Sequence, residues 1–309
     1  MESLTNTVAK IVFPTDFTQL AMNALDLAIA MCKRHNAVLH MVNTVELDYY
    51  SFSIEPYSSA VYSNQEVLDT SKDNLQKLSD EIEKSHGVKC VVHVESGNPA
   101  YYICTVASEI VADLIIMATH GASGVREFFI GSNAYKVVKH APCPVLTVPG
   151  SFRKTRFDKI MFPIRSTSGI EEKYEVVKSI LMEKNTVLEV TGIVDKSKPE
   201  QISKISDSLS KLKMRMVDDN LNFHSDLFYA SNIAGDILRI AGEKEVDLLA
   251  INATLDYNWR EVFVGPYTQQ VVNHASIPVL SFRPIVPEKT ETDTSAKKKY
   301  SSTDPLTSV

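Results

Sequence analysis

The residues best suited to chemistry lie in one segment of the first half of the chain. The sequence MATHG at 117–121 is followed by nine residues and then by Gly131 and Ser132, where a helix is expected to begin. Glycine permits tight turns and close approach to a ligand, and a helix N-terminus presents free N–H groups to an anion. The segment is therefore typical of a phosphate cradle, with Ser132 adding a hydroxyl donor. From spacing alone, the two glycines could instead serve only as turn residues.

A second candidate lies at the end of a short apolar run near the N-terminus. The sequence PTDF occupies 14–17, so Asp16 directly follows a predicted strand. Its carboxylate could accept a hydrogen bond from an exocyclic amine such as that of adenine. The alternative is that Asp16 only caps the helix that follows. The sequence leaves these two roles open.

Patterns typical of known catalytic sites are missing from the sequence. Val125 stands where a GxSxG nucleophile elbow needs glycine, and the histidines show no HExxH or HxxxH spacing. Slow ATP hydrolysis or self-phosphorylation on Ser132 would have only His120 as a nearby base, and we expect no lysine in the cradle. We therefore expect a protein that is not an enzyme and holds no metal.

Composition excludes several classes of protein. The chain has 309 residues, with 32 Lys and Arg against 38 Asp and Glu, a net charge of −6. An acidic chain without a basic stripe does not favour nucleic-acid binding, and no apolar run is long enough to predict a membrane span. The start of the chain lacks a signal-peptide pattern. The four cysteines, Cys32, Cys90, Cys104 and Cys143, are expected to be reduced and buried, as in a cytoplasmic protein.

An internal repeat divides the chain. Residues 97–146 and 231–280 align without a gap and are identical at 18 of 50 positions. KIVFP at 10–14 matches KIMFP at 159–163 at a different offset. The repeat predicts two homologous domains, at 1–150 and 155–285. The polar stretch 287–309 is expected to be disordered.

Each copy is predicted to alternate strands and helices. In the first copy we expect strands at 9–14, 37–43, 88–94, 113–118 and 144–148 and helices at 18–35, 65–85, 99–111 and 132–140. Alternating units of this kind favour a parallel sheet with helices on both faces, so each domain is predicted to be a five-stranded, doubly wound α/β fold. Ligands of such sheets bind at the carboxyl ends of the strands. The aromatic segment 46–65 could be a lid there, could pack on the other domain, or could be mobile.

The motifs PTDF, MATHG-x9-GS and KHAPCPVLTV resemble the universal stress protein (UspA-like) family, and both halves of the chain share the likeness. The resemblance implies a Rossmann-like, tandem member that binds ATP, with AMP or ADP and Mg²⁺ as variants. It implies that Pro14, Thr15, Asp16 and Met41 contact adenine, that Met117 and Ala118 line the ribose, and that His120, Gly121, Gly131, Ser132 and Asn133 surround the phosphates. The family motif begins with glycine where this chain has Ala118.

The second copy departs from this pattern. Arg165 replaces Asp16, Leu255 replaces Gly121 and Pro266 replaces Ser132, so we expect this half not to bind ATP. The resemblance implies that the two domains form an internal pseudo-dimer along 145–148 and 279–282, with a homodimer as an additional arrangement. A stress-response or signalling role follows from the family. The alternative function is a nucleotide-free adaptor that uses the fold as a docking surface.

Overall fold

The computed structural model describes residues 8–45, 60–119, 130–165, 169–181, 183–252, 255–258, 261–264 and 266–282. The candidate residues His120 and Gly121, the aromatic positions 46–59 and the tail 287–309 lie outside the described residues.

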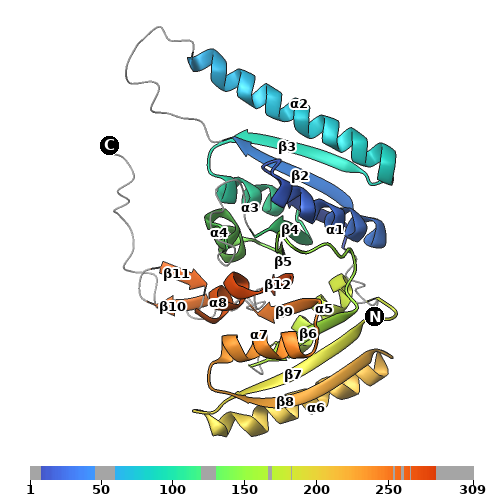
Figure 1. Ribbon diagram of the computed structural model, residues 1–309, viewed down its shortest axis with the longest axis vertical. Coiled ribbons are helices and arrows are strands. Elements are labelled where there is room, and N and C mark those ends of the chain that lie inside the picture. The colour runs from blue at the N-terminus through green and yellow to red at the C-terminus, as the bar shows by residue number, and fades with distance from the viewer. Residues whose placement is uncertain are drawn as a thin grey trace, which may run out of the picture.

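The first half of the chain alternates strands and helices in the predicted order (Figure 1). Its strands are β1 (Lys10–Pro14), β2 (Val38–Val45), β3 (Cys90–Ser96), β4 (Leu114–Ala118) and β5 (Val145–Val148). Its helices are α1 (Gln19–His35), α2 (Ala60–His86), α3 (Pro99–Glu109) and α4 (Ser132–His140). Helix α2 begins at Ala60 rather than near residue 65, so the end of the aromatic segment belongs to it.

The second half repeats this succession. Its strands are β6 (Lys159–Ile164), β7 (Val187–Asp195), β8 (Asn222–Ala230), β9 (Leu248–Asn252) and β12 (Val279–Phe282). Its helices are α5 (Ile170–Leu181), the short 3-10 helix η2 (Pro199–Gln201), α6 (Ile202–Asp218), α7 (Ile233–Glu243) and α8 (Pro266–His274). A hairpin of β10 (Leu255–Asn258) and β11 (Glu261–Val264), which the sequence analysis did not expect, precedes α8.

All strands other than the hairpin form one sheet of ten strands in the order β3-β2-β1-β4-β5-β12-β9-β6-β7-β8. Pairing within each half is parallel, and both halves have the same strand order. The molecule is thus an α/β protein of two tandem doubly wound domains, each with a five-stranded parallel sheet. The strand order reverses between β1 and β4, where sheets of this kind bind ligands.

The two halves meet at an antiparallel seam between β5 and β12. Leu146 pairs with Leu280 and Thr147 with Val279, and the Thr147 hydroxyl donates to the Val279 carbonyl at 3.2 Å. This is the strand pairing that the sequence analysis expected for 145–148 and 279–282. The seam makes the two sheets continuous, as Figure 1 shows at its centre.

Several residues that are identical in the two copies of the repeat make the same structural contacts in both halves. Asp113 accepts hydrogen bonds from the backbone N–H groups of Ala9 and Lys10, at 2.7 and 2.9 Å. Asp247 accepts the corresponding bonds at the start of β6. Asn98 and Asn232 cap α3 and α7 through their side chains. These polar residues fix the start of a strand or helix, which explains their presence in both copies.

The core lies on both faces of the sheet. A cluster that spans both halves fills one face and includes residues of α1 and α5. Two smaller clusters fill the other face, one under α3 and α4 and one under α7 and α8. All four cysteines are free, but only Cys32 is fully buried, so the expected burial of the other three is only partial. None of the described helices is long and apolar enough to cross a membrane.

Candidate functional site

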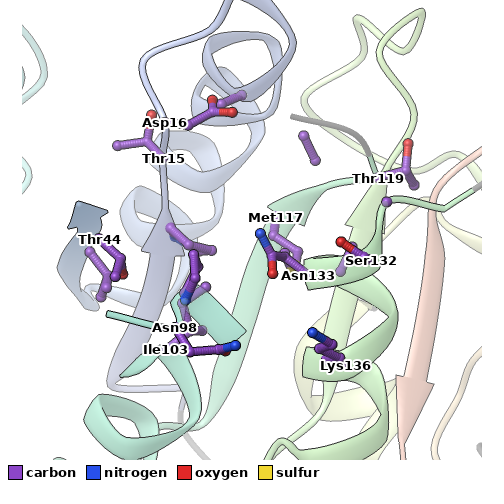
Figure 2. A pocket seen from close by; sticks show the side chains of 17 residues that line it. Thr15, Asp16, Thr44, Asn98, Ile103, Met117, Thr119, Ser132, Asn133 and Lys136 are labelled. Atoms are coloured by element: carbon purple, nitrogen blue, oxygen red, sulfur yellow. The ribbon is translucent and has the colours of Figure 1, made fainter. Parts of the chain in front are cut away.

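A cavity of about 580 Å³ lies at the carboxyl ends of β1 and β4 and at the N-terminus of α4. Its size falls within the range of pockets that hold small molecules and cofactors. Figure 2 shows side chains from β1, β2 and α3 facing others from β4 and α4 across it. The lining residues are Pro14, Thr15, Asp16, Ala21, Val42, Thr44, Asn98, Pro99, Ile103, Met117, Ala118, Thr119, Gly131, Ser132, Asn133, Ala134 and Lys136.

The fold brings most of the predicted site residues together in this cavity. Segments that are more than a hundred positions apart meet here because β1 and β4 are neighbours in the sheet. The predicted residues that line the cavity are Pro14, Thr15, Asp16, Met117, Ala118, Gly131, Ser132 and Asn133. His120 and Gly121 fall outside the described residues, so their predicted roles stay predictions.

Met41 is a correction to the predicted set. Its side chain is fully buried in the large cluster on the opposite face of the sheet, together with Leu39 and Leu75. Side chains alternate between the two faces of a strand, so Val42 and Thr44 of β2 line the cavity instead. The implied contact of Met41 with adenine is therefore not one that its side chain makes.

The turn after β1 is held in place from two sides. The Thr15 N–H donates to the Val42 carbonyl at 2.9 Å, and the Thr15 carbonyl accepts from Asn43 Nδ2 at 2.7 Å. Asn43 is buried and in turn accepts a short hydrogen bond from Ser71 of α2. Thr15 also accepts a bond from the Phe17 N–H through its hydroxyl. A backbone fixed in this way keeps a constant shape where a ligand would meet it.

Asp16 supports the capping of α1 without being the N-cap itself. Its Oδ1 accepts from the Thr18 N–H at 3.0 Å and from the Thr18 hydroxyl at 2.6 Å. Thr18, not Asp16, is the N-cap of α1, because its hydroxyl accepts from the Ala21 N–H. Asp16 therefore orients the capping residue while its exposed carboxylate lies at the rim of the cavity. The next residue, Phe17, has a φ of 61°, a left-handed conformation that is uncommon for a bulky side chain and often marks a functional turn.

The N-terminus of α4 forms the opposite wall. Gly131 is the N-cap and makes no side-chain capping bond, so the first N–H groups of the helix have no partner within the helix. The Gly131 N–H itself donates to the Thr119 carbonyl at 2.7 Å, which ties the start of α4 to the end of β4. Ser132 and Asn133 follow at the cavity wall, as Figure 2 shows. The arrangement is suited to an anion.

The structure also adds residues that the sequence reasoning missed. Lys136 lines the cavity, so the expectation of no lysine in the cradle is wrong. It lies one helical turn after Ser132, and this spacing could have revealed it, since residues four apart share a helix face. Asn98, the N-cap of α3, and Thr44 line the cavity from its other side. Thr44 lies near the end of β2 and Asn98 follows β3, and these strand ends approach the site only after the sheet is assembled.

The corresponding place in the second half is nearly filled. Its cavity measures only about 40 Å³. The guanidinium carbon of Arg165 lies 3.5 Å from the centre of the Tyr267 ring, and burial raises the pKa of Tyr267 to about 12. Lys173 also lines this space and is buried, which lowers its pKa. Two cations and a ring thus occupy the volume that stays open in the first half.

Comparison with known proteins supports the resemblance seen in the motifs. The model of the universal stress protein family matches residues 7–149. A universal stress protein of Staphylococcus aureus strain USA300 is 33% identical over 174 residues, which cover 55% of this chain and 98% of that protein.

Solved structures resemble both halves together. A universal stress protein from Archaeoglobus fulgidus has a TM-score of 0.67 at 16% identity and covers 90% of this chain and 97% of its own. One from Pseudomonas aeruginosa UCBPP-PA14 has a TM-score of 0.63 at 14% identity, with 91% and 95% covered. At such identities these structures support the fold, whereas the family follows from the sequence matches. The chain belongs to the universal stress protein family.

Proposed function

We propose that the first half of the chain binds an adenine nucleotide, with ATP as the preferred candidate, and that binding serves a stress-response or signalling role in the cytoplasm. The observation that carries the proposal is the cavity of about 580 Å³ in which eight of the predicted contact residues converge. The same residues are those that the family resemblance implied as ligand contacts. Agreement between motif and geometry supports a ligand role over a purely structural one.

The two ends of the cavity differ in chemistry. The β1 end offers the Asp16 carboxylate and the fixed backbone of Thr15, which suit the amine and ring nitrogens of a purine. The α4 end offers the N–H groups of the first helical turn, the Ser132 hydroxyl and the Lys136 ammonium, which suit phosphates. Met117 lies between the two ends in Figure 2. A nucleotide placed with its base at β1 would have its phosphates at α4.

Ala118 bears on how tightly such a ligand binds. It stands where the family motif begins with glycine, and it lines the cavity with 8% of its surface exposed. One methyl group reduces the room beside the ribose without closing a cavity of this size. We therefore propose that the nucleotide binds with an affinity modestly lower than a glycine at this position would give.

The second half supports a stoichiometry of one nucleotide per chain. Its cavity of about 40 Å³ is too small for a nucleotide. Arg165 replaces the carboxylate that would face the base, and Pro266 at the start of α8 lacks the N–H that Ser132 provides. We assign this half, with the span 155–285, the role of a partner domain to residues 1–150.

Calorimetric titration of nucleotide-stripped protein with Mg-ATP tests the proposal. We expect one site per chain. Two sites would contradict the assignment of the second half. No heat and no binding at millimolar ATP would reject the proposal and favour the nucleotide-free adaptor, which Ala118 and the nearly filled second cavity also suit. Inorganic triphosphate serves as a control for binding through phosphates alone.

A further inference from the structure

Ile130, the residue directly before the helix that forms the anion end of the cavity, lies between the two halves of the molecule. Its side chain packs against the cluster under α3 and α4 of the first half. It also packs against the cluster under α7 and α8 of the second half. One side chain thus joins two hydrophobic clusters that otherwise belong to separate domains.

A hydrogen bond fixes the backbone of the same residue. The Ile130 N–H donates to the Oδ1 of Asn273 on α8 at 3.2 Å, across a sequence separation of 143 residues. Asn273 is half-buried, so the bond is partly shielded from water. This side chain of the second half therefore helps to set where the chain enters α4.

The position of Ile130 affects the start of α4, which forms the phosphate cradle. Gly131 comes next, caps α4 and donates to the Thr119 carbonyl at 2.7 Å. The entry to α4 is therefore held by β4 of its own domain through Gly131 and by α8 of the other domain through Ile130. These two restraints together set the direction of the first N–H groups of the helix.

The repeat does not reproduce the residues of this hydrogen bond. The counterparts of Ile130 and Asn273 at the repeat offset are Val264 of β11 and Lys139 of α4. Strand β11 contacts α4, so the backbones of the two halves also approach each other at this place. A lysine ammonium carries no acceptor, however, and cannot take an N–H bond as Asn273 does. A bond like the one from the Ile130 N–H to Asn273 therefore cannot form with Lys139 as its acceptor.

We infer that Asn273 is a positioning residue for the phosphate end of the nucleotide site, through which the second half of the chain controls nucleotide affinity in the first. The inference rests on the proposed nucleotide function. It gives the second half a specific task in that function: to hold the cradle of its neighbour in a binding conformation.

The experiment compares three variants of the full-length protein. Asn273→Ala removes the acceptor, Asn273→Asp keeps an acceptor of the same size, and Gln269→Ala changes an exposed side chain on the same helix as a control. Affinities for Mg-ATP and for adenosine are measured by calorimetry. Amide hydrogen exchange at residues 130–135 is measured without ligand. Loss of one hydrogen bond corresponds to about a fivefold change in an equilibrium.

We expect Asn273→Ala to weaken ATP about fivefold, to leave adenosine affinity unchanged and to speed exchange at Ile130. Asn273→Asp should restore both properties, and Gln269→Ala should alter neither. Equal losses for ATP and adenosine would show general loosening and overturn the inference. So would unchanged ATP affinity in Asn273→Ala, or exchange at Ile130 that does not respond. Failure of the wild-type protein to bind ATP would instead reject the proposed function, and the exchange data would still show whether Asn273 restrains the helix entry.

Discussion

The guanidinium of Arg165 stacks on the ring of Tyr267, 3.5 Å from its centre, at the place in the second half where the first half has Asp16 and Asn133. The Nη1 atom of Arg165 is buried and has no hydrogen-bond partner among the residues that the structure describes. The contact with the ring compensates in part for this burial, since cations are attracted to aromatic faces. The same fold position thus holds an open acidic rim in one half and a cation packed on a ring in the other.

Asp16 and Arg165 provide a matched pair of variants. We expect Asp16→Ala to weaken ATP more than inorganic triphosphate, because the carboxylate is assigned to the base rather than to the phosphates. Arg165→Ala should leave ATP affinity and the stoichiometry of one site unchanged. Both ligands are titrated calorimetrically against each variant. An equal loss of ATP and triphosphate in Asp16→Ala would remove this residue from the base end of the site.

A variant of Gly131 tests the phosphate end of the proposed site. We expect Gly131→Val to abolish ATP binding, because a branched side chain at the entry to α4 would fill space assigned to the phosphates. The residue has a φ of −60°, which valine can adopt, so the fold should persist. Circular dichroism and the thermal unfolding midpoint check the fold. Gly265→Val, at the counterpart position in the repeat, is the control and should keep nucleotide binding. Unchanged affinity in Gly131→Val would refute the cradle.

Lys136 should strengthen nucleotide binding through its positive charge. We expect Lys136→Ala to weaken ATP about three- to tenfold, with a smaller effect on AMP, because an exposed lysine adds modest electrostatic attraction that grows with ligand charge. The difference between variant and wild type should shrink at high salt. Lys139→Ala on the same helix serves as the control, since Lys139 does not line the cavity. The same loss for ATP and AMP would indicate a structural effect instead.

Much of this architecture could be predicted from the sequence because the repeat and the apolar runs carry it. Asp113 and Asp247 recur at the same offset since each fixes the start of a first strand. The pairing of the strand at 145–148 with that at 279–282 was implied by the family resemblance. Parallel order follows from alternating strands and helices.

Other features depend on assembled geometry that a linear pattern does not contain. Met41 was implied as a contact by the family resemblance, whereas the alternation of side chains along β2 places Val42 in the cavity. Lys136 was not predicted because the motif ends at Ser132, in the first turn of α4. The bond between Ile130 and Asn273 depends on how two domains dock across the β5–β12 seam. No local spacing encodes that contact.

Asn43 links the stability of the fold to the shape of the site. We expect Asn43→Leu to lower the free energy of unfolding by about 1–3 kcal/mol, because it leaves the Thr15 carbonyl without its donor. Denaturant unfolding measures this change. Ser71→Ala removes only the bond from the Ser71 hydroxyl to Asn43 and should cost less. A loss as large for Ser71→Ala as for Asn43→Leu would show that the turn after β1 does not depend on the Asn43 amide.

The histidine pair of the first half should make stability depend on pH. His40 Nδ1 lies 3.1 Å from His93 Nε2, and the two rings stack. Burial, with smaller effects of His93 and Lys10, lowers the pKa of His40 to about 4. The unfolded chain, with an ordinary histidine pKa of about 6.5, binds more protons than the folded protein between these two values. Stability from this pair is therefore fully present above about pH 6.5 and is lost as the pH falls towards 4.

We expect the thermal unfolding midpoint of the wild-type protein to fall between pH 7 and 5, and we expect His40→Gln to reduce that slope, because a neutral amide takes up no proton in this range. Thermal unfolding in a buffer series of constant ionic strength provides the measurement. His274→Gln changes an exposed histidine and should keep the wild-type slope. If His40→Gln kept the full slope while His274→Gln reduced it, the pH dependence would arise outside the buried pair, and the low pKa of His40 would not govern the stability of this domain.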